Sequence, residues 1–125
     1  MSDLPIGRLD RAEPFTTKDG STIREVAGAV SLRTANQSLA EATVPAGTAT
    51  DAHYHHVSEE IYHFTSGSGR MQLGDREGHV RAGDTVVIPP GVEHKLWAST
   101  DVDLVLLCCC APPYSNDDTV ITEPG

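Results

Sequence analysis

The sequence predicts an all-β protein, built as a sandwich or barrel of short strands. Short apolar runs recur along the chain, separated by glycine- and proline-rich turns at spacings of roughly 8–12 residues, which is typical of such folds. No window predicts a convincing helix: the best one, residues 27–38, contains Gly28 and β-branched residues, and its apolar positions form no stripe. With 125 residues, the chain is long enough for one hydrophobic core but not for two domains.

The chain divides into an arm and a domain. Residues 1–20 are polar and show no periodicity, so we expect an N-terminal arm that lies on a single domain formed by residues 21–125. Turn residues such as the Pro-Ala-Gly after residue 44 separate the strands of that domain. The expected strands are 21–26, 38–44, 60–65, 70–73, 79–81, 85–88, 94–98 and 103–110. The tail, residues 114–125, is expected to form an edge strand or an ordered wrap.

The charge balance excludes two classes of partner. Nine Lys and Arg stand against eighteen Asp and Glu, which gives a net charge of −9. Nucleic acids and anionic membranes both require clustered basic side chains, so neither is an expected partner. No apolar run is long enough to span a bilayer, and no secretory signal is visible.

The three cysteines are consecutive, at Cys108, Cys109 and Cys110. Neighbours on an extended chain point to opposite faces, so the run is not a disulfide framework and indicates a reducing compartment. We therefore expect a cytoplasmic protein. No Lys or Arg adjoins the run to lower a thiol pKa, so core packing is favoured over a redox role.

Histidines cluster in one part of the chain: four of the six lie within residues 53–63. His53 and His55 are two residues apart, so on a strand they share one face at about 7 Å along the chain and can converge on one ion. Glu60 follows a short polar segment that can reverse the chain, and His94 lies just after a Pro-Pro-Gly turn. Three imidazoles and one carboxylate suit iron, manganese, nickel or zinc, whereas calcium and magnesium prefer oxygen ligands. Any one of these histidines alone would be interpreted as a surface or hydrogen-bonding residue.

Two stretches carry a family resemblance. The first, residues 47–67, resembles the first motif of the cupins: a glycine, five residues, His-x-His, three or four residues, a glutamate, six residues and a glycine. The residues that fit are Gly47, His53, His55, Glu60 and Gly67.

The second stretch, residues 83–98, resembles the second cupin motif. Gly83, Pro89, Gly91 and His94 fit, but Ala98 replaces an asparagine of the family pattern. Because that asparagine is not a metal ligand in the family, the departure leaves the implied metal site intact.

The resemblance implies a jelly-roll (cupin) β-barrel, commonly a homodimer, with a divalent transition metal inside the barrel. The implied ligands are His53, His55, Glu60 and His94. Glu59 competes with Glu60, but the six-residue spacing to Gly67 favours Glu60, and strand alternation then turns Glu59 outward. Iron or manganese is the leading expectation for the metal, with zinc or nickel as alternatives.

Strand alternation adds neighbours to this site. Counting from Glu60, Tyr62 and Phe64 face inward and His63 faces the opposite way. Tyr62 is the candidate catalytic residue, since its hydroxyl can orient a substrate or donate a proton. The alternative interpretation is a core aromatic with a satisfied hydroxyl.

Other residues near the motifs have simpler expectations. Trp97 is expected to face outward and to pack against the N-terminal arm or a partner subunit. His56 and His63 are expected at the surface or behind the ligands. Arg70 is the only basic side chain expected to reach the pocket, so a phosphorylated substrate is disfavoured.

A metal with open coordination positions favours three functions. The leading hypothesis is an oxygenase that acts on a small, chelating organic molecule with at most one charge. The alternatives are an isomerase or decarboxylase that uses the metal as a Lewis acid, and a non-catalytic module that binds a metal or a small ligand.

Overall fold

The computed structural model describes residues 4–29 and 31–123, so parts of the expected arm (residues 1–3), domain (residue 30) and tail (residues 124–125) lie outside the described residues. Within the described part, a single 3₁₀ turn, η1 (Leu9–Arg11), precedes a series of strands. The strands are β1 (Phe15–Thr16), β2 (Thr22–Ala27), β3 (Ser38–Val44), β4 (His53–His55), β5 (Glu59–Ser66), β6 (Ser68–Leu73), β7 (Arg76–Arg81), β8 (Thr85–Ile88), β9 (His94–Ala98), β10 (Leu104–Ala111) and β11 (Thr119–Ile121). The all-β prediction is confirmed.

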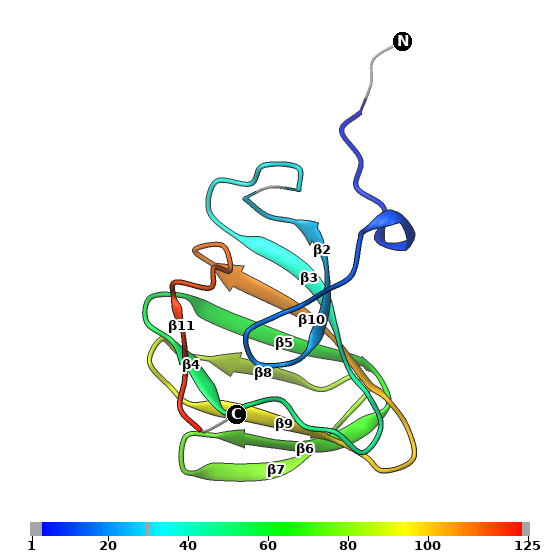
Figure 1. Cartoon of the computed structure of the whole chain (residues 1–125), viewed down its shortest axis with the longest axis vertical. Coiled ribbons are helices and arrows are strands. Elements are labelled where there is room, and N and C mark those ends of the chain that lie inside the picture. Colours follow the sequence, from blue (N-terminus) through cyan, green and yellow to red (C-terminus); the bar gives the residue numbers. More distant parts are fainter. Residues whose placement is uncertain (1–3, 30, 124–125) are drawn as a thin grey trace.

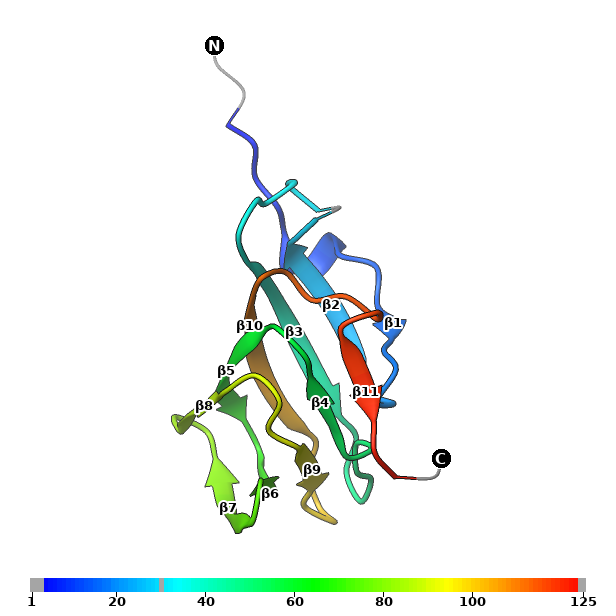
Figure 2. The same cartoon turned by 90° about the vertical axis from the view of Figure 1, so that its left-hand side faces the viewer.

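The strands form two antiparallel sheets that face each other (Figures 1 and 2). The six-stranded sheet has the order β1-β2-β3-β10-β5-β8, and the five-stranded sheet has the order β11-β4-β9-β6-β7. From β3 onward the chain crosses repeatedly between the sheets, which is the jelly-roll arrangement. The side chains that face inward from both sheets therefore share one interior.

Most expected strands are present within a few residues of their predicted bounds. Strands β3, β8 and β9 have the predicted bounds, and β2, β5, β6, β7 and β10 begin or end one to three residues away. The tail contains an edge strand, β11, that pairs with β4. A short strand that the sequence did not predict, β1, pairs with β2 within the segment expected as an arm.

Alternation along the strands builds both the core and the site. On β5, Glu60, Tyr62 and Phe64 are buried while the residues between them are exposed. The largest fully buried apolar side chains are Phe64, Ile88, Leu104, Leu106 and Val44. The polar site residues thus lie on the same inward faces as the apolar core.

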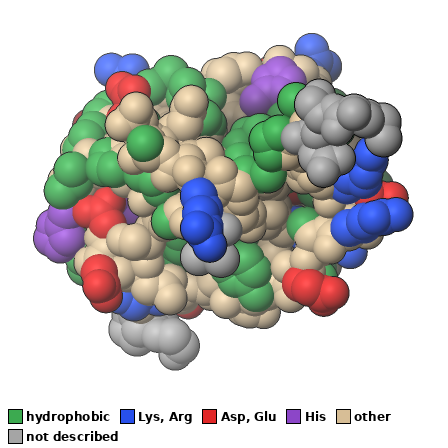
Figure 3. Space-filling model, turned by 90° about the horizontal axis from the view of Figure 1, so that it is seen from above, with side chains coloured by type: hydrophobic (Ala, Val, Ile, Leu, Met, Phe, Trp, Pro, Cys, Tyr) green, Lys and Arg blue, Asp and Glu red, His purple; other side chains and the backbone are tan. Residues whose placement is uncertain are grey.

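The outer surface is mixed in character. On the face seen in Figure 3, Lys and Arg side chains are scattered, and Asp and Glu side chains lie among apolar and polar atoms. Within the described residues, no helix is long and apolar enough to cross a membrane.

Candidate metal centre

Three buried histidines meet between two strands of the five-stranded sheet. Strand β4 directs His53 and His55 inward, and its pairing with β9 places His94 directly opposite His53. The ring centroids of His53 and His94 are 4.2 Å apart, and those of His55 and His94 are 5.4 Å apart. One nitrogen of each ring lies within 4.8 Å of the others, so the three rings can share one ion.

Two of these rings are fixed by backbone carbonyls. The Nδ1 atom of His53 lies 2.8 Å from the carbonyl oxygen of Asp51, and Nδ1 of His94 lies 3.0 Å from that of Val92. A carbonyl oxygen only accepts, so each Nδ1 carries the proton and donates it. Both Nε2 atoms of the neutral rings therefore hold free lone pairs.

The third ring is fixed by a hydroxyl. Nδ1 of His55 lies 3.1 Å from Oγ1 of Thr119 on β11, and that hydroxyl donates its own proton to the carbonyl oxygen of Ser115 at 2.9 Å. Because the hydroxyl has no second proton, it accepts from His55, and Nε2 of His55 also holds a lone pair. Three lone pairs thus converge on one point.

Glu60 adds a buried carboxylate to the same cluster. Its Oε1 lies 3.1 Å from Nε2 of His55 and 3.5 Å from Nε2 of His94. Burial alone would raise the pKa of Glu60, but the neighbouring His55 and His94 outweigh burial and bring the pKa to about 2. Its other oxygen, Oε2, accepts a hydrogen bond from the Cys110 thiol at 3.1 Å. Glu59 is exposed on the opposite face of the strand.

The donor set fits a divalent transition metal. Nε2 of His94 is fully buried and, among the buried side-chain nitrogens and oxygens of the described residues, it alone has no hydrogen-bond partner. The cluster offers lone pairs and a carboxylate but no proton donor among them, so a cation satisfies all of these atoms together. Imidazole nitrogens with a carboxylate are ligands that iron, manganese, nickel and zinc accept.

The turn that separates His55 from Glu60 is held by the tail. Both carboxylate oxygens of Asp118 accept backbone N–H groups, from Val57 at 2.9 Å and from Ser58 at 3.0 Å. Partial burial raises the pKa of Asp118, but the bonds from Ser58 and Val57 outweigh it and lower the pKa. Asp118 therefore orients the turn that brings the carboxylate of Glu60 back to His55.

Asp19 is a site residue that sequence reasoning missed. It lies in the turn between β1 and β2, and its Oδ2 is 3.5 Å from Nε2 of His53. Burial and the neighbouring His94 lower the pKa of His53, so this ring favours its neutral form beside the carboxylate. The only sequence signal was a polar turn, Thr-Lys-Asp-Gly-Ser, which is typical of any tight connection.

The interior around the cluster is small and mostly apolar. A cavity of about 30 Å³ lies beside the histidines, with Ile23, Val44, Leu96 and Leu106 in its wall. Tyr62 also lines it, with its ring centroid 5.7 Å from that of His94. Burial, reinforced by Glu60, raises the pKa of Tyr62, so its phenol stays protonated.

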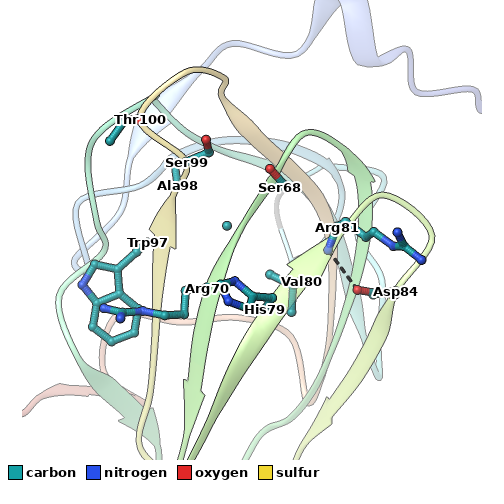
Figure 4. A pocket seen from close by; sticks show the side chains of 11 residues that line it. Ser68, Arg70, His79, Val80, Arg81, Asp84, Trp97, Ala98, Ser99 and Thr100 are labelled. Atoms are coloured by element: carbon teal, nitrogen blue, oxygen red, sulfur yellow. Dashed lines mark hydrogen bonds between the residues drawn. The ribbon is translucent and has the colours of Figure 1, made fainter.

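One expectation about surrounding residues was wrong. Arg70 does not reach the interior: it lies on the outer face of the sheet, with its guanidinium carbon 4.5 Å from the Trp97 ring centroid (Figure 4). Its Nε atom pairs with Glu77 at 2.9 Å. Trp97 faces outward, as expected, and its ring contacts Arg70 and Lys95. Its packing against the N-terminal arm or a partner subunit stays a prediction. Arg70 pairs with Trp97 across strands, so both point to the same side of the sheet.

The hollow shown in Figure 4 is separate from the histidine cluster. It has a volume of about 610 Å³ and lies over β6, β7 and β9, where Arg70, His79, Arg81 and Trp97 contribute to its lining. None of the predicted metal ligands lines it.

The remaining histidines and the cysteines lie where alternation predicts. His56 and His63 are exposed, and Nδ1 of His63 bonds with Thr85 at 2.8 Å. Cys108 and Cys110 are buried inside, and Cys109 is half-buried on the outer face. Burial raises the pKa of both inner thiols, which favours their packing role.

Sequence relatives extend over most of the chain. An uncharacterized protein of Methanocaldococcus jannaschii is 46% identical over 114 residues, which cover 91% of each chain. Protein SchB of Streptomyces halstedii is 26% identical over 79% of this chain and 72% of its own length.

Solved structures share the fold at low identity. Pac13 of Streptomyces, a nucleoside dehydratase, superposes in its uridine complex with a TM-score of 0.78 and 15% identity over 98% of this chain and 93% of Pac13. KdgF of Halomonas sp. gives a TM-score of 0.75 with 18% identity over 90% of this chain and 97% of that chain. A predicted oxalate decarboxylase of Thermotoga maritima gives 0.74 with 18% identity over 86% of this chain and 98% of that chain. The cupin domain model itself matches residues 40–110, which contain the whole histidine and glutamate cluster. The chain is therefore a member of the cupin family, a small cupin domain with a histidine triad suited to a divalent metal.

Proposed function

We propose that this protein is a metal-dependent enzyme that acts on a small, chelating organic molecule. The metal would be held by His53, His55, Glu60 and His94, with iron or manganese as the leading ions. One observation carries the proposal: three imidazole lone pairs and a carboxylate converge in a buried space with no proton donor among them.

An ion at this position would supply Lewis acidity and, if it is iron or manganese, the ability to activate dioxygen. The chain's own residues define what can meet it. Apolar side chains such as Leu96 and Leu106 form part of the cavity wall. The phenol of Tyr62 stays protonated, so it can donate a hydrogen bond or a proton to an oxygen of the substrate.

The interior favours a substrate with little charge. Among the described residues that line the cavity, none is Lys or Arg, whereas Asp19 and Glu60 both contribute carboxylates. A phosphorylated molecule would find no cationic side chain there. Dioxygen is small and apolar, so this lining supports oxygenase-type oxidation as the leading reaction.

A redox-neutral reaction, isomerisation or decarboxylation, is the second candidate. The protonated Tyr62 can give a proton to a substrate oxygen within the cavity, which such reactions require. The names of structurally similar proteins, a dehydratase and a predicted oxalate decarboxylase, agree with this class.

Metal analysis tests the site, and oxygen uptake separates the two reactions. Purified protein should contain about one transition ion per chain, and His94→Ala should lose most of it. His63→Ala is the matched control, because His63 is an exposed histidine of β5. Full occupancy in His94→Ala would refute the assignment.

Oxygen consumption with a panel of 2-oxo acids, enols and diols supports the oxygenase, while conversion of a substrate without oxygen consumption supports the second candidate. A ligand retained without turnover supports a binding module.

We also propose that the protein is a cytoplasmic homodimer whose residues 21–125 form one domain bordered by an arm of residues 1–20. An outward apolar row supports the dimer. Leu39, Ile61 and Val87 are 37%, 37% and 52% exposed, and they align across the six-stranded sheet with Cys109 between the first two. A monomeric native mass would refute the dimer.

A further inference from the structure

Asp19 is held in one orientation by its own turn. Its Oδ1 accepts three hydrogen bonds, from Thr17 Oγ1 at 2.6 Å, from the Ser21 backbone N–H at 3.0 Å and from Ser21 Oγ at 2.8 Å. These donors fix the plane of the carboxylate, and they leave Oδ2 directed at Nε2 of His53, 3.5 Å away. The side chain is only 11% exposed.

The turn itself is tied to the elements that carry the histidines. The backbone N–H of Asp51, two residues before His53, donates to the carbonyl oxygen of Asp19 at 2.7 Å. The Nζ atom of Lys18 donates to the carbonyl oxygen of Thr119 at 2.8 Å, and Thr119 is the residue that orients His55. The position of Asp19 is therefore set by the same scaffold as the triad.

The contact between Asp19 and His53 joins two acceptors. The proton of His53 is on Nδ1, where it is donated to the carbonyl oxygen of Asp51. Nε2 therefore presents a lone pair to a carboxylate oxygen inside a low-dielectric interior, where the two groups repel. A cation between them turns this repulsion into attraction.

The two carboxylates contact different histidines of the triad. Glu60 lies beside His55 and His94, and Asp19 lies beside His53. Neither carboxylate duplicates the position of the other.

We propose that Asp19 contributes a second carboxylate to the metal centre, delivered by the turn between β1 and β2. This inference rests on the proposed function, since it requires a metal at the triad. With Glu60 alone, a divalent ion and its ligands carry a formal charge of +1. With Asp19 as well, the charge is zero, so the centre binds small anions weakly and favours neutral chelating ligands.

Cobalt(II) binding to the metal-free protein tests this role without any assay of activity. The variants are Asp19→Asn, which keeps an oxygen for Thr17 and Ser21, and Asp10→Asn, a matched loss of one exposed carboxylate from η1. We expect Asp19→Asn to bind cobalt at least about tenfold more weakly, with an altered visible spectrum. Azide should bind the cobalt centre of this variant more tightly than that of the wild type, and Asp10→Asn should match the wild type throughout.

The outcomes separate this inference from the proposed function. The inference alone is overturned if Asp19→Asn keeps the wild-type cobalt affinity, spectrum and azide binding while His94→Ala loses cobalt binding. Absence of cobalt binding in the wild type would overturn both. Melting curves of the metal-free proteins identify a folding defect. If Asp19→Asn melts well below the wild type, Asp19→Ser is measured by the same criteria.

Discussion

Replacement of His94 by leucine should have opposite effects on stability with and without metal. His94 is completely buried, and its Nε2 has no hydrogen-bond partner. In metal-free protein, leucine removes that unsatisfied nitrogen, which is worth about 1–3 kcal/mol. It also removes the bond from Nδ1 to the Val92 carbonyl, worth about 1 kcal/mol. We therefore expect the free energy of unfolding of His94→Leu to lie between that of the wild type and about 2 kcal/mol above it.

With metal, the order of stability should reverse. An ion at a hundred times its dissociation constant stabilises the folded wild type by about 2.7 kcal/mol. For 125 residues, the entropy of unfolding is about 0.26 kcal/mol/K, so the melting temperature should rise by about 10 °C. The variant lacks one of the three imidazoles and should gain little.

Urea and thermal unfolding in chelator and in excess metal measure both halves of this prediction. His63→Leu serves as the control, because His63 is exposed and its only described partner is Thr85, so its response to metal should equal that of the wild type. The reasoning is refuted if His94→Leu is more than about 1 kcal/mol less stable than the wild type in chelator. Equal stabilisation of both proteins by metal would refute it as well.

Three further predictions concern neighbours of the site. Tyr62→Phe should keep metal content and stability but lower turnover by about a hundredfold, since general acid catalysis contributes that much. Unchanged turnover in a steady-state assay would show that Tyr62 is a core residue without a catalytic role. The stability that Asp118 provides should be complete above about pH 4 and lost as pH falls through its lowered pKa. The difference in unfolding free energy between the wild type and Asp118→Asn, measured in urea, should therefore shrink from about pH 7 to about pH 2, and a constant difference would contradict this. Under native conditions a thiol reagent should modify Cys109 first, while Cys108 and Cys110 react only after unfolding, because burial raises their pKa values. If mass spectrometry instead shows rapid modification of all three cysteines, the interior opens readily.

The sequence predicted the parts of the site that depend on local patterns. Two-residue spacing on a strand was enough to place His53 and His55 on one face, and alternation places Glu59 and Glu60 on opposite faces. Turn residues predicted most of the strands because glycine and proline end them for steric reasons. The histidine pair therefore follows from a local pattern. The choice of Glu60 over Glu59 follows from the spacing of the first cupin motif, and His94 follows from the spacing of the second.

Features that depend on distant pairing were not predictable. Asp19 reaches His53 only because its carbonyl accepts a bond from Asp51, far away along the chain. Arg70 was assigned to the wrong side because the expected strand began at residue 70, which left its register open. In the structure Met71 pairs with Leu96 on the inner face, and Arg70 is therefore directed outward.

The size of the interior cavity has a kinetic consequence. A space of about 30 Å³ accommodates roughly one water molecule, so an organic ligand can enter only when the walls of the cavity separate. The rate of association should then depend on how often the walls separate, and it should level off as ligand concentration rises. The affinity measured in solution includes the free energy of that opening, so a variant that loosens the wall can bind the same ligand more tightly without any new contact.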